Sequence, residues 1–201
     1  MKKAFYLLTL ISLALSSCKS SKEASLTNNQ NNKREIMELK NISPIEKVGY
    51  EKIKGSHWVS HTEIIIDATP EQVWSVLTDT KSYGDWNEII LKIDGEIVDK
   101  GEVDVLFKAG PKAKPRKFHN YLYVEDGVEF YWSQVQAMGI KDRHCFRVEA
   151  TKDGKTRFIQ SDQAMGGLTW MLGKVAAKTQ LNVYPIFNRS LKEEVERRFP
   201  M

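Results

Sequence analysis

The chain has 201 residues, with 30 Lys and Arg against 26 Asp and Glu and a formal net charge of +4 at pH 7. The two kinds of charge are interleaved, without the basic stripe that is typical of nucleic-acid binding. We therefore expect no nucleic-acid partner, and the length after an N-terminal extension suits one hydrophobic core and one domain.

Residues 1–17 have the organisation of a secretory signal peptide. Two lysines precede an apolar run over residues 4–15, and small residues follow it. The run is shorter than the roughly 20 residues that span a bilayer. The ending Leu15-Ser16-Ser17-Cys18 resembles the lipobox of bacterial lipoproteins, which implies cleavage before Cys18 and lipidation of that cysteine. An ordinary signal peptide or a buried strand is the alternative.

This interpretation places the protein in the bacterial cell envelope, extracytoplasmic and attached to a membrane through lipid on Cys18. Lys19 is not the aspartate that retains some lipoproteins at an inner membrane, so an outer membrane is the plausible address. Residues 18–47 are polar and form the lipidated cysteine and a flexible tether, since such a composition cannot offset the entropy of ordering. The folded domain is expected over residues 48–201, with Cys145 as a free thiol.

The domain is expected to open with one strand and two short helices. Residues 58–67 are rich in β-branched side chains, which favours a strand. Thr69 is suited to cap a helix from Pro70 to about residue 79, because threonine is a good N-cap and proline fits the first helical position. A second helical turn is predicted over residues 82–86.

The remainder predicts an antiparallel sheet and a long helix. Strands are expected over residues 89–97, 101–107, 117–124, 128–135, 144–150 and 156–161, and Asp-Gly pairs mark two of the tight turns. After Gly166-Gly167, residues 168–199 have a helical pattern with an apolar stripe of Leu172, Val175, Thr179, Val183 and Ile186. The order predicts an α+β fold, a curved antiparallel sheet wrapped around a long C-terminal helix.

The beginning of this domain also resembles a known superfamily. Residues 64–74 (IIIDATPEQVW), followed by Leu77-Thr78-Asp79, Tyr83 and Trp86, are similar to the opening of the START-like helix-grip superfamily, and most similar to its polyketide cyclase/dehydrase-like branch, the SRPBCC group. The resemblance covers residues 57–199. It implies a cavity between sheet and helix for an apolar ligand. Members bind lipids, sterols, polyketides or plant hormones, and a minority catalyse cyclisation or dehydration, so the fold alone does not choose a function.

Strand alternation predicts which side chains face that cavity. The expected ligand-binding set combines aromatic residues with a few polar ones: Phe107, Asn120, Phe130, Trp132, Gln134, His144, Phe146, Phe158 and Gln160. For each polar member the alternative is a core residue paired with a backbone group. A shift of one residue would turn the whole set of a strand outward. Asp and Glu are expected mostly at turns or on the outer face.

Catalytic patterns are sparse in this sequence. The four histidines lack the spacing of a helical zinc site, so neither a metal nor a cofactor is predicted. His144 is the best candidate for an acid–base group, since its reference pKa lies near neutrality. Its neighbour Cys145 should point to the opposite face of the strand and so cannot pair with it. Trp74 is expected to pack against the sheet, whereas Trp86 is left unassigned and Trp170 is a candidate gate.

Three functions are consistent with these observations. The preferred one is a membrane-anchored lipoprotein that binds or carries a hydrophobic small molecule or lipid. The alternatives are a cyclase or dehydratase that uses His144, and a non-catalytic interaction module with a filled core. A cavity above about 300 Å³ would disfavour the filled core, and an acid–base pair beside that cavity would favour the enzyme.

Overall fold

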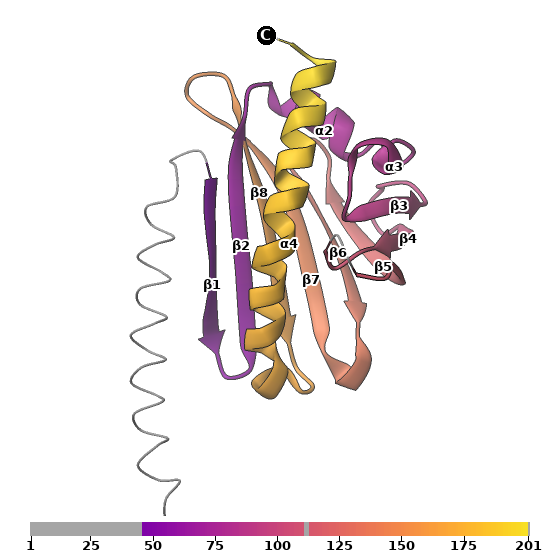
Figure 1. Cartoon of the computed structure of the whole chain (residues 1–201), viewed down its shortest axis with the longest axis vertical. Helices are drawn as coiled ribbons and strands as arrows, with labels where there is room; N and C mark the ends of the chain where they lie inside the picture. Colours follow the sequence, from indigo (N-terminus) through magenta and orange to yellow (C-terminus); the bar gives the residue numbers. More distant parts are fainter. Residues whose placement is uncertain (1–45, 111–112, 201) are drawn as a thin grey trace, which may run out of the picture. The chain divides into compact units, whose positions relative to one another are not determined.

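The computed structural model describes residues 46–110 and 113–200 (Figure 1). The predicted signal peptide, the lipidation site Cys18 and all but the last two residues of the predicted tether lie outside the described residues. Within the described part the chain runs through two strands, two short helices, six strands and a long helix. This order confirms the predicted α+β helix-grip fold.

Eight antiparallel strands form one sheet in the order β1-β2-β8-β7-β6-β5-β4-β3. Their bounds are β1 Glu46–Lys54, β2 His57–Ile66, β3 Ile90–Asp94, β4 Glu102–Phe107, β5 Arg116–Glu125, β6 Glu129–Val135, β7 Lys141–Ala150 and β8 Thr156–Met165. Strand β1 was not predicted. It is an edge strand that pairs only with β2, and its sequence EKVGYEKIK is too polar to show the alternation of a half-buried strand.

Strands β7 and β8 are longer than predicted. β7 begins at Lys141 instead of residue 144, and β8 ends at Met165 instead of residue 161. Both extensions contain an aspartate, a residue type that is depleted in strands and therefore suggested an earlier end. The extra residues of these two strands place Asp142 and Asp162 among the buried residues of the inner face.

The helices are α2 (Pro70–Leu77), α3 (Tyr83–Trp86) and α4 (Thr169–Arg198), with a short 3₁₀ turn η1 (Ala137–Gly139) between β6 and β7. Thr69 caps α2 as predicted. Its hydroxyl accepts from the amide of Gln72 at 3.4 Å, and the Gln72 side chain accepts from the amide of Thr69 at 2.9 Å. This reciprocal pair is a capping box, which satisfies two amides at the start of the helix.

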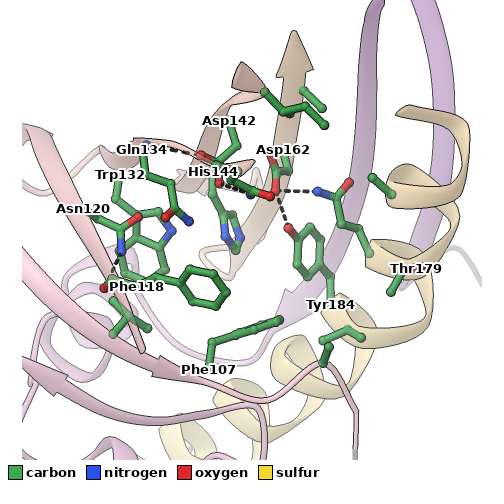
Figure 2. Close-up of a pocket in the computed structure, with 18 of the residues that line it drawn as sticks. Phe107, Phe118, Asn120, Trp132, Gln134, Asp142, His144, Asp162, Thr179 and Tyr184 are labelled. Carbon is green, nitrogen blue, oxygen red and sulfur yellow. Dashed lines mark hydrogen bonds between the residues drawn. The ribbon is translucent and has the colours of Figure 1, made fainter. Parts of the chain in front are cut away.

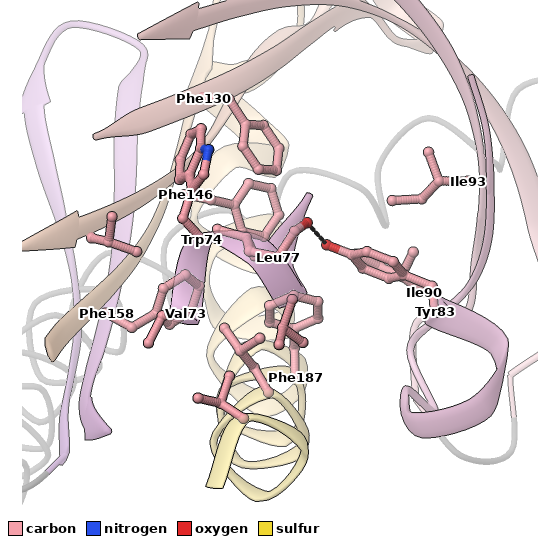
Figure 3. Packing of buried hydrophobic residues seen from close by; sticks show 14 of the residues in the cluster. Val73, Trp74, Leu77, Tyr83, Ile90, Ile93, Phe130, Phe146, Phe158 and Phe187 are labelled. Carbon is pink, nitrogen blue, oxygen red and sulfur yellow. Dashed lines mark hydrogen bonds between the residues drawn. The ribbon is translucent and has the colours of Figure 1, made fainter. Parts of the chain in front are cut away.

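Figure 3 shows the aromatic core that fills the space between α2, the sheet and the C-terminal half of α4. The rings of Phe130 and Phe146 stack at 4.8 Å, and Phe187 of α4 lies 5.5 Å from Phe146. Trp74 packs edge-on against Phe130, as predicted, and its indole donates to Asp126 at 3.0 Å. Trp86 is half-buried against Tyr83, at 4.8 Å, so it too is a packing residue.

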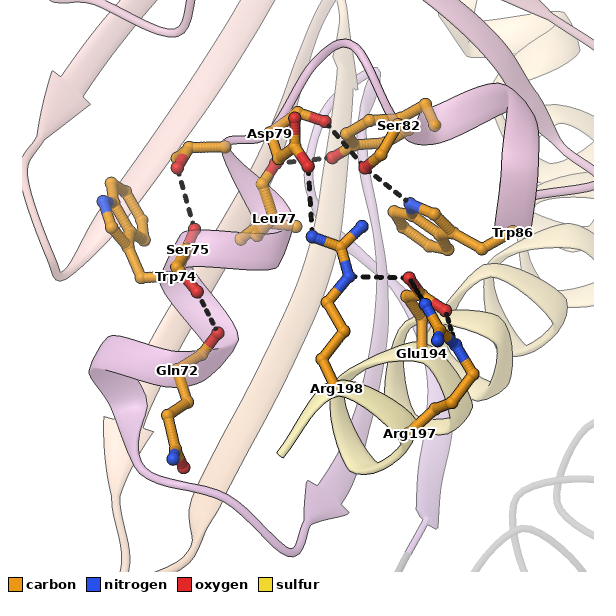
Figure 4. Close-up of polar contacts among 12 residues, drawn as sticks. Gln72, Trp74, Ser75, Leu77, Asp79, Ser82, Trp86, Glu194, Arg197 and Arg198 are labelled. Carbon is orange, nitrogen blue, oxygen red and sulfur yellow. Dashed lines mark hydrogen bonds and ion pairs between the residues drawn. The ribbon is translucent and has the colours of Figure 1, made fainter. Parts of the chain in front are cut away.

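Charged residues join the end of α4 to the loop between α2 and α3 (Figure 4). The guanidinium of Arg198 donates to Glu194 at 2.6 Å and to Asp79 at 3.0 Å. Glu194 is buried and also accepts from Arg197. These contacts hold the C-terminal end of α4 beside α2, and so position the helix across the sheet.

Candidate functional site

A cavity of about 450 Å³ lies between the inner face of the sheet and the N-terminal half of α4 (Figure 2). Its wall is formed by β4 to β8 and by the segment of α4 between Leu172 and Tyr184. Apolar side chains supply most of the wall, and polar groups gather on β6, β7, β8 and the facing turns of α4. A cavity of this size is within the range of small-molecule sites and is too large for the filled-core alternative.

The nine predicted ligand-binding residues divide between this cavity and the core. Phe107, Asn120, Trp132, Gln134 and His144 line the cavity. Phe130, Phe146, Phe158 and Gln160 are fully buried outside its wall, in the end of the inner face that α2 covers. The predicted strand parity is therefore correct for all of these strands, but parity does not reveal how far along a strand the cavity extends.

The helix contributes a wall that the predicted set did not include. Its residues are Leu172, Val175, Ala176, Thr179, Gln180, Val183 and Tyr184. The apolar stripe in the sequence contained four of these seven, so the signal was present. The sequence alone does not separate the positions of the stripe that line the cavity from those that pack against the core, such as Ile186.

Asp162 on β8 is the most strongly perturbed acidic group of the cavity. Its Oδ2 accepts from the Tyr184 hydroxyl at 2.6 Å and from the Gln180 amide at 2.6 Å, while its Oδ1 is buried without a hydrogen-bond partner. Burial first, and then the nearby carboxyl of Asp142, raise the pKa of Asp162 to about 7. A carboxyl with such a pKa exchanges its proton near neutral pH.

Asp142 on β7 is the second carboxyl of the wall. Its Oδ1 accepts from the backbone amide of Gln134 at 3.2 Å, and its Oδ2 accepts from the Gln136 side chain at 3.1 Å. The register pairs His144 with Asp162, so Asp142 and Asp162 are diagonal neighbours, with Cα atoms about 7–8 Å apart. Burial raises the pKa of Asp142 as well. Sequence reasoning missed both residues because it ended the two strands too early.

His144 lies in the cavity wall as predicted, in an apolar environment. Its ring stacks between Phe146 at 4.3 Å and Tyr184 at 4.6 Å, and its Nε2 accepts from the Gln160 amide at 2.8 Å. Burial lowers the pKa of His144 to about 3, so the ring is neutral at physiological pH and a weak proton acceptor. Asp162 rather than His144 therefore has the pKa that acid–base chemistry near neutrality needs.

Two further predicted residues lie outside the cavity. Cys145 is a free thiol on the outer side of β7, with its Sγ 3.8 Å from the Glu129 carboxylate. Burial, and then Glu129, raise its pKa to about 11. Trp170, the candidate gate, is 67% exposed at the start of α4 and is not part of the cavity wall.

Residues 46–110 and 113–200 contain neither a metal-binding group of side chains nor a helix fit to cross a membrane. No group of three or more His, Cys, Asp or Glu side chains in this part of the chain is arranged to hold a metal ion. In the same residues, no helix combines the length and the apolar character that crossing a membrane requires.

The sequence model for polyketide cyclase/dehydrase and lipid transport proteins matches residues 57–196. The chain belongs to this family. Solved structures of similar fold cover a comparable share of the chain. A START-superfamily protein from Mycobacterium smegmatis is 14% identical with a TM-score of 0.57, and covers 70% of this chain and 98% of its own. No curated protein sequence matches the chain.

Two other solved structures are similar in fold to this member of the polyketide cyclase/dehydrase and lipid transport family. The Zhui aromatase/cyclase from a Streptomyces species is 15% identical with a TM-score of 0.55, over 71% of this chain and 95% of its own. A protein from Rhodobacter sphaeroides is 16% identical with a TM-score of 0.59, over 76% of this chain and 99% of its own. Identities this low establish the fold alone.

Proposed function

We propose that the protein is a membrane-anchored, extracytoplasmic lipoprotein that binds or carries a hydrophobic small molecule or lipid. The observation that carries the proposal is the cavity of about 450 Å³, with its largely apolar wall. A drug-sized apolar molecule gains affinity when its surface leaves water, by about 25 cal/mol per Å². The family description, which includes lipid transport, supports the same assignment.

The membrane attachment in this proposal rests on the sequence of residues 1–18. Replacement of Cys18 with Ser should abolish labelling by a fatty-acid probe and leave unprocessed precursor, because the lipid acceptor is removed. The matched control is Cys145→Ser, which changes the other cysteine and should leave labelling intact. Fatty-acid labelling of the Cys18→Ser protein would contradict the anchor.

Ligand binding is tested by filling the cavity. Ala176 lines the cavity from α4, so Ala176→Trp should displace an apolar probe. Ala150 is exposed at the end of β7, so Ala150→Trp is the control of equal added volume. Nile red fluorescence should report binding to wild-type protein and to the control, with affinity reduced at least about tenfold in Ala176→Trp. The proposal is overturned if wild-type protein neither binds Nile red nor co-purifies with lipid.

A cyclase or dehydratase is the second candidate, because Asp162 in the cavity wall has a pKa of about 7. Enzymes tune carboxyl groups to this range for proton transfer. The candidate acid–base residue is then Asp162, with Tyr184 beside it, instead of His144. Against this, the neutral His144 is too weak a base to form an acid–base pair with Asp162.

The effect of one substitution, Asp162→Asn, distinguishes the two functions. Asp162→Asn should change the affinity of a binding protein, whereas it should reduce the turnover of an enzyme by roughly 10²-fold or more. The measurement is incubation of any co-purified ligand with wild-type protein, followed by mass spectrometry for a loss of water. A mass change that depends on Asp162 would favour the enzyme.

A further inference from the structure

In the described part of the chain, the polar end of the cavity has acidic side chains and no cationic one. Asp142 and Asp162 are both buried in the wall, and the other polar members there are neutral: Asn120, Gln134, Gln136, His144, Thr179, Gln180 and Tyr184. Among the residues that the structure describes, neither a lysine nor an arginine lines the cavity. A buried carboxyl is ordinarily paired with a positive group or kept protonated, so a positive group in the cavity would stabilise the ionised form of this wall.

Unused hydrogen-bonding capacity points in the same direction. Of the described cavity-lining side chains, two have a buried polar atom without a partner, and both atoms are acceptors: Oδ1 of Asp162 and Oδ1 of Asn120. Asp162 is 4% exposed, and an unpaired buried acceptor costs about 1–3 kcal/mol. The amide assignment of Asn120 follows from its nitrogen, which donates to the Phe118 carbonyl at 3.2 Å. Each of these two atoms would therefore accept a hydrogen bond from a donor on a ligand.

We propose that the ligand is a hydrophobic molecule with a protonated amine, whose nitrogen binds Asp162 and whose apolar body lies along Phe107 and the α4 wall. The inference rests on the proposed binding function and names its ligand class. An ammonium group supplies both missing elements, a positive charge and up to three donors. Charge-assisted hydrogen bonds of this kind are about twice as strong as neutral ones. A carboxylate or phosphate head group would instead be repelled by the same wall.

The pH dependence of binding follows from the groups that face the nitrogen. These are Asp142 and His144 from β7, Asp162 from β8 and Tyr184 from α4; the described lining residues of β4, β5 and β6 do not titrate. His144 stays neutral above about pH 4, and Tyr184 stays protonated because its pKa is raised. An alkylamine remains charged to about pH 10. Affinity for the amine should therefore rise about tenfold or more between pH 5 and 8, as Asp162 ionises.

The test is displacement of Nile red from the full-length protein by three ligands of equal chain length, decylamine, decanol and decanoate. At pH 8 the amine should bind at least about tenfold more tightly than the alcohol, and the carboxylate should bind most weakly. Asp162→Asn should bring the amine to the level of the alcohol while Nile red still binds, which shows that the variant is folded. Asp153→Asn, at an exposed turn, is the control and should keep the preference.

The outcomes separate this inference from the proposed function. If Nile red and decanol bind but the amine has no advantage, or if decanoate binds most tightly, the amine inference is overturned and hydrophobic binding stands. If none of the four binds, the proposed function itself fails. If Asp162→Asn does not fold, two other measurements decide. They are the amine preference of Asp142→Asn and the wild-type ratio of amine to alcohol affinity at pH 5 and pH 8. A wild-type ratio that does not change with pH overturns the inference.

Discussion

Asp162 loses its solvent when β8 packs against α4, and this links the stability of the fold to pH. Its pKa is about 7 in the folded protein and 3.8 in an exposed aspartate, so between these values the folded state holds a proton that the unfolded chain has released. The free energy of unfolding should therefore fall as the pH rises from about 4 to 7. A pKa difference of about three corresponds to an upper bound on the order of 4 kcal/mol.

Urea unfolding at several pH values measures this effect. In Asp162→Asn the side chain cannot ionise, so the decline in stability between pH 4 and 7 should become much smaller than in wild-type protein. Asp153→Asn, whose carboxyl is exposed and has a lowered pKa, is the control and should retain the decline. A decline of equal size in wild-type protein and Asp162→Asn would mean that another group is responsible.

Cys145 provides a test of strand orientation at the same scale. Because it lies on the outer side of β7, it should react with iodoacetamide in the folded protein. Reaction at pH 8 should be slow, since only the thiolate reacts and the thiol pKa is about 11. Glu129→Gln removes the nearby negative charge and should accelerate labelling several-fold. Glu149→Gln, which removes a carboxylate that binds Arg147 and Arg157, should not change the rate.

At the scale of elements, features that depend on neighbouring residues could be predicted from the sequence. The cap at Thr69 and the tight turns at Asp126-Gly127 and Asp153-Gly154 are of this kind, because a cap or a turn is determined by a few adjacent side chains. Strand β1 and the ends of β7 and β8 could not be predicted. They exist because neighbouring strands of the sheet pair with them, and this pairing outweighs the weak local preference of Asp142 and Asp162 for a strand.

The candidate site illustrates the same limit. Alternation along β6 placed Phe130, Trp132 and Gln134 correctly on the inner face, since side chains alternate with a period of two. Whether an inner residue meets the cavity or the core depends on where α2 and α4 cross the sheet. Phe130 is covered by Trp74 of α2, whereas Trp132 is beyond that helix and meets the cavity. This crossing is a property of tertiary packing that periodicity does not contain.

The attachment of α4 to α2 yields a prediction about the end of the long helix. Arg198→Gln breaks the link between Glu194 and Asp79 and leaves a buried carboxylate with fewer donors, so the free energy of unfolding should fall by about 1–3 kcal/mol. Arg197 also binds Glu194, but its side chain is 70% exposed, and Arg197→Gln should cost less than about 1 kcal/mol. Thermal unfolding of both variants measures the difference. Equal losses would show that the link to Asp79 contributes nothing.

At the scale of the whole molecule, the two halves of α4 bury side chains of different size. The first half buries the small residues Thr169, Gly173 and Ala177, whereas the second buries Tyr184, Phe187, Leu191 and other large side chains. Pro185 lies where the halves meet and cannot donate a backbone hydrogen bond. The half that covers the cavity is therefore attached by less apolar contact than the half that covers the core.

This asymmetry has a kinetic consequence. Segments with little buried apolar surface open at a lower free energy than the whole protein unfolds, so the amides of residues 172–181 should exchange hydrogen faster than those of residues 187–197. Bound Nile red should slow exchange in the first group alone, and equal exchange in both groups would contradict a local opening. If the first half of α4 opens in this way, the opening of the helix limits the rate of ligand uptake. Its rate should then level off at high probe concentration, at the frequency with which the helix opens.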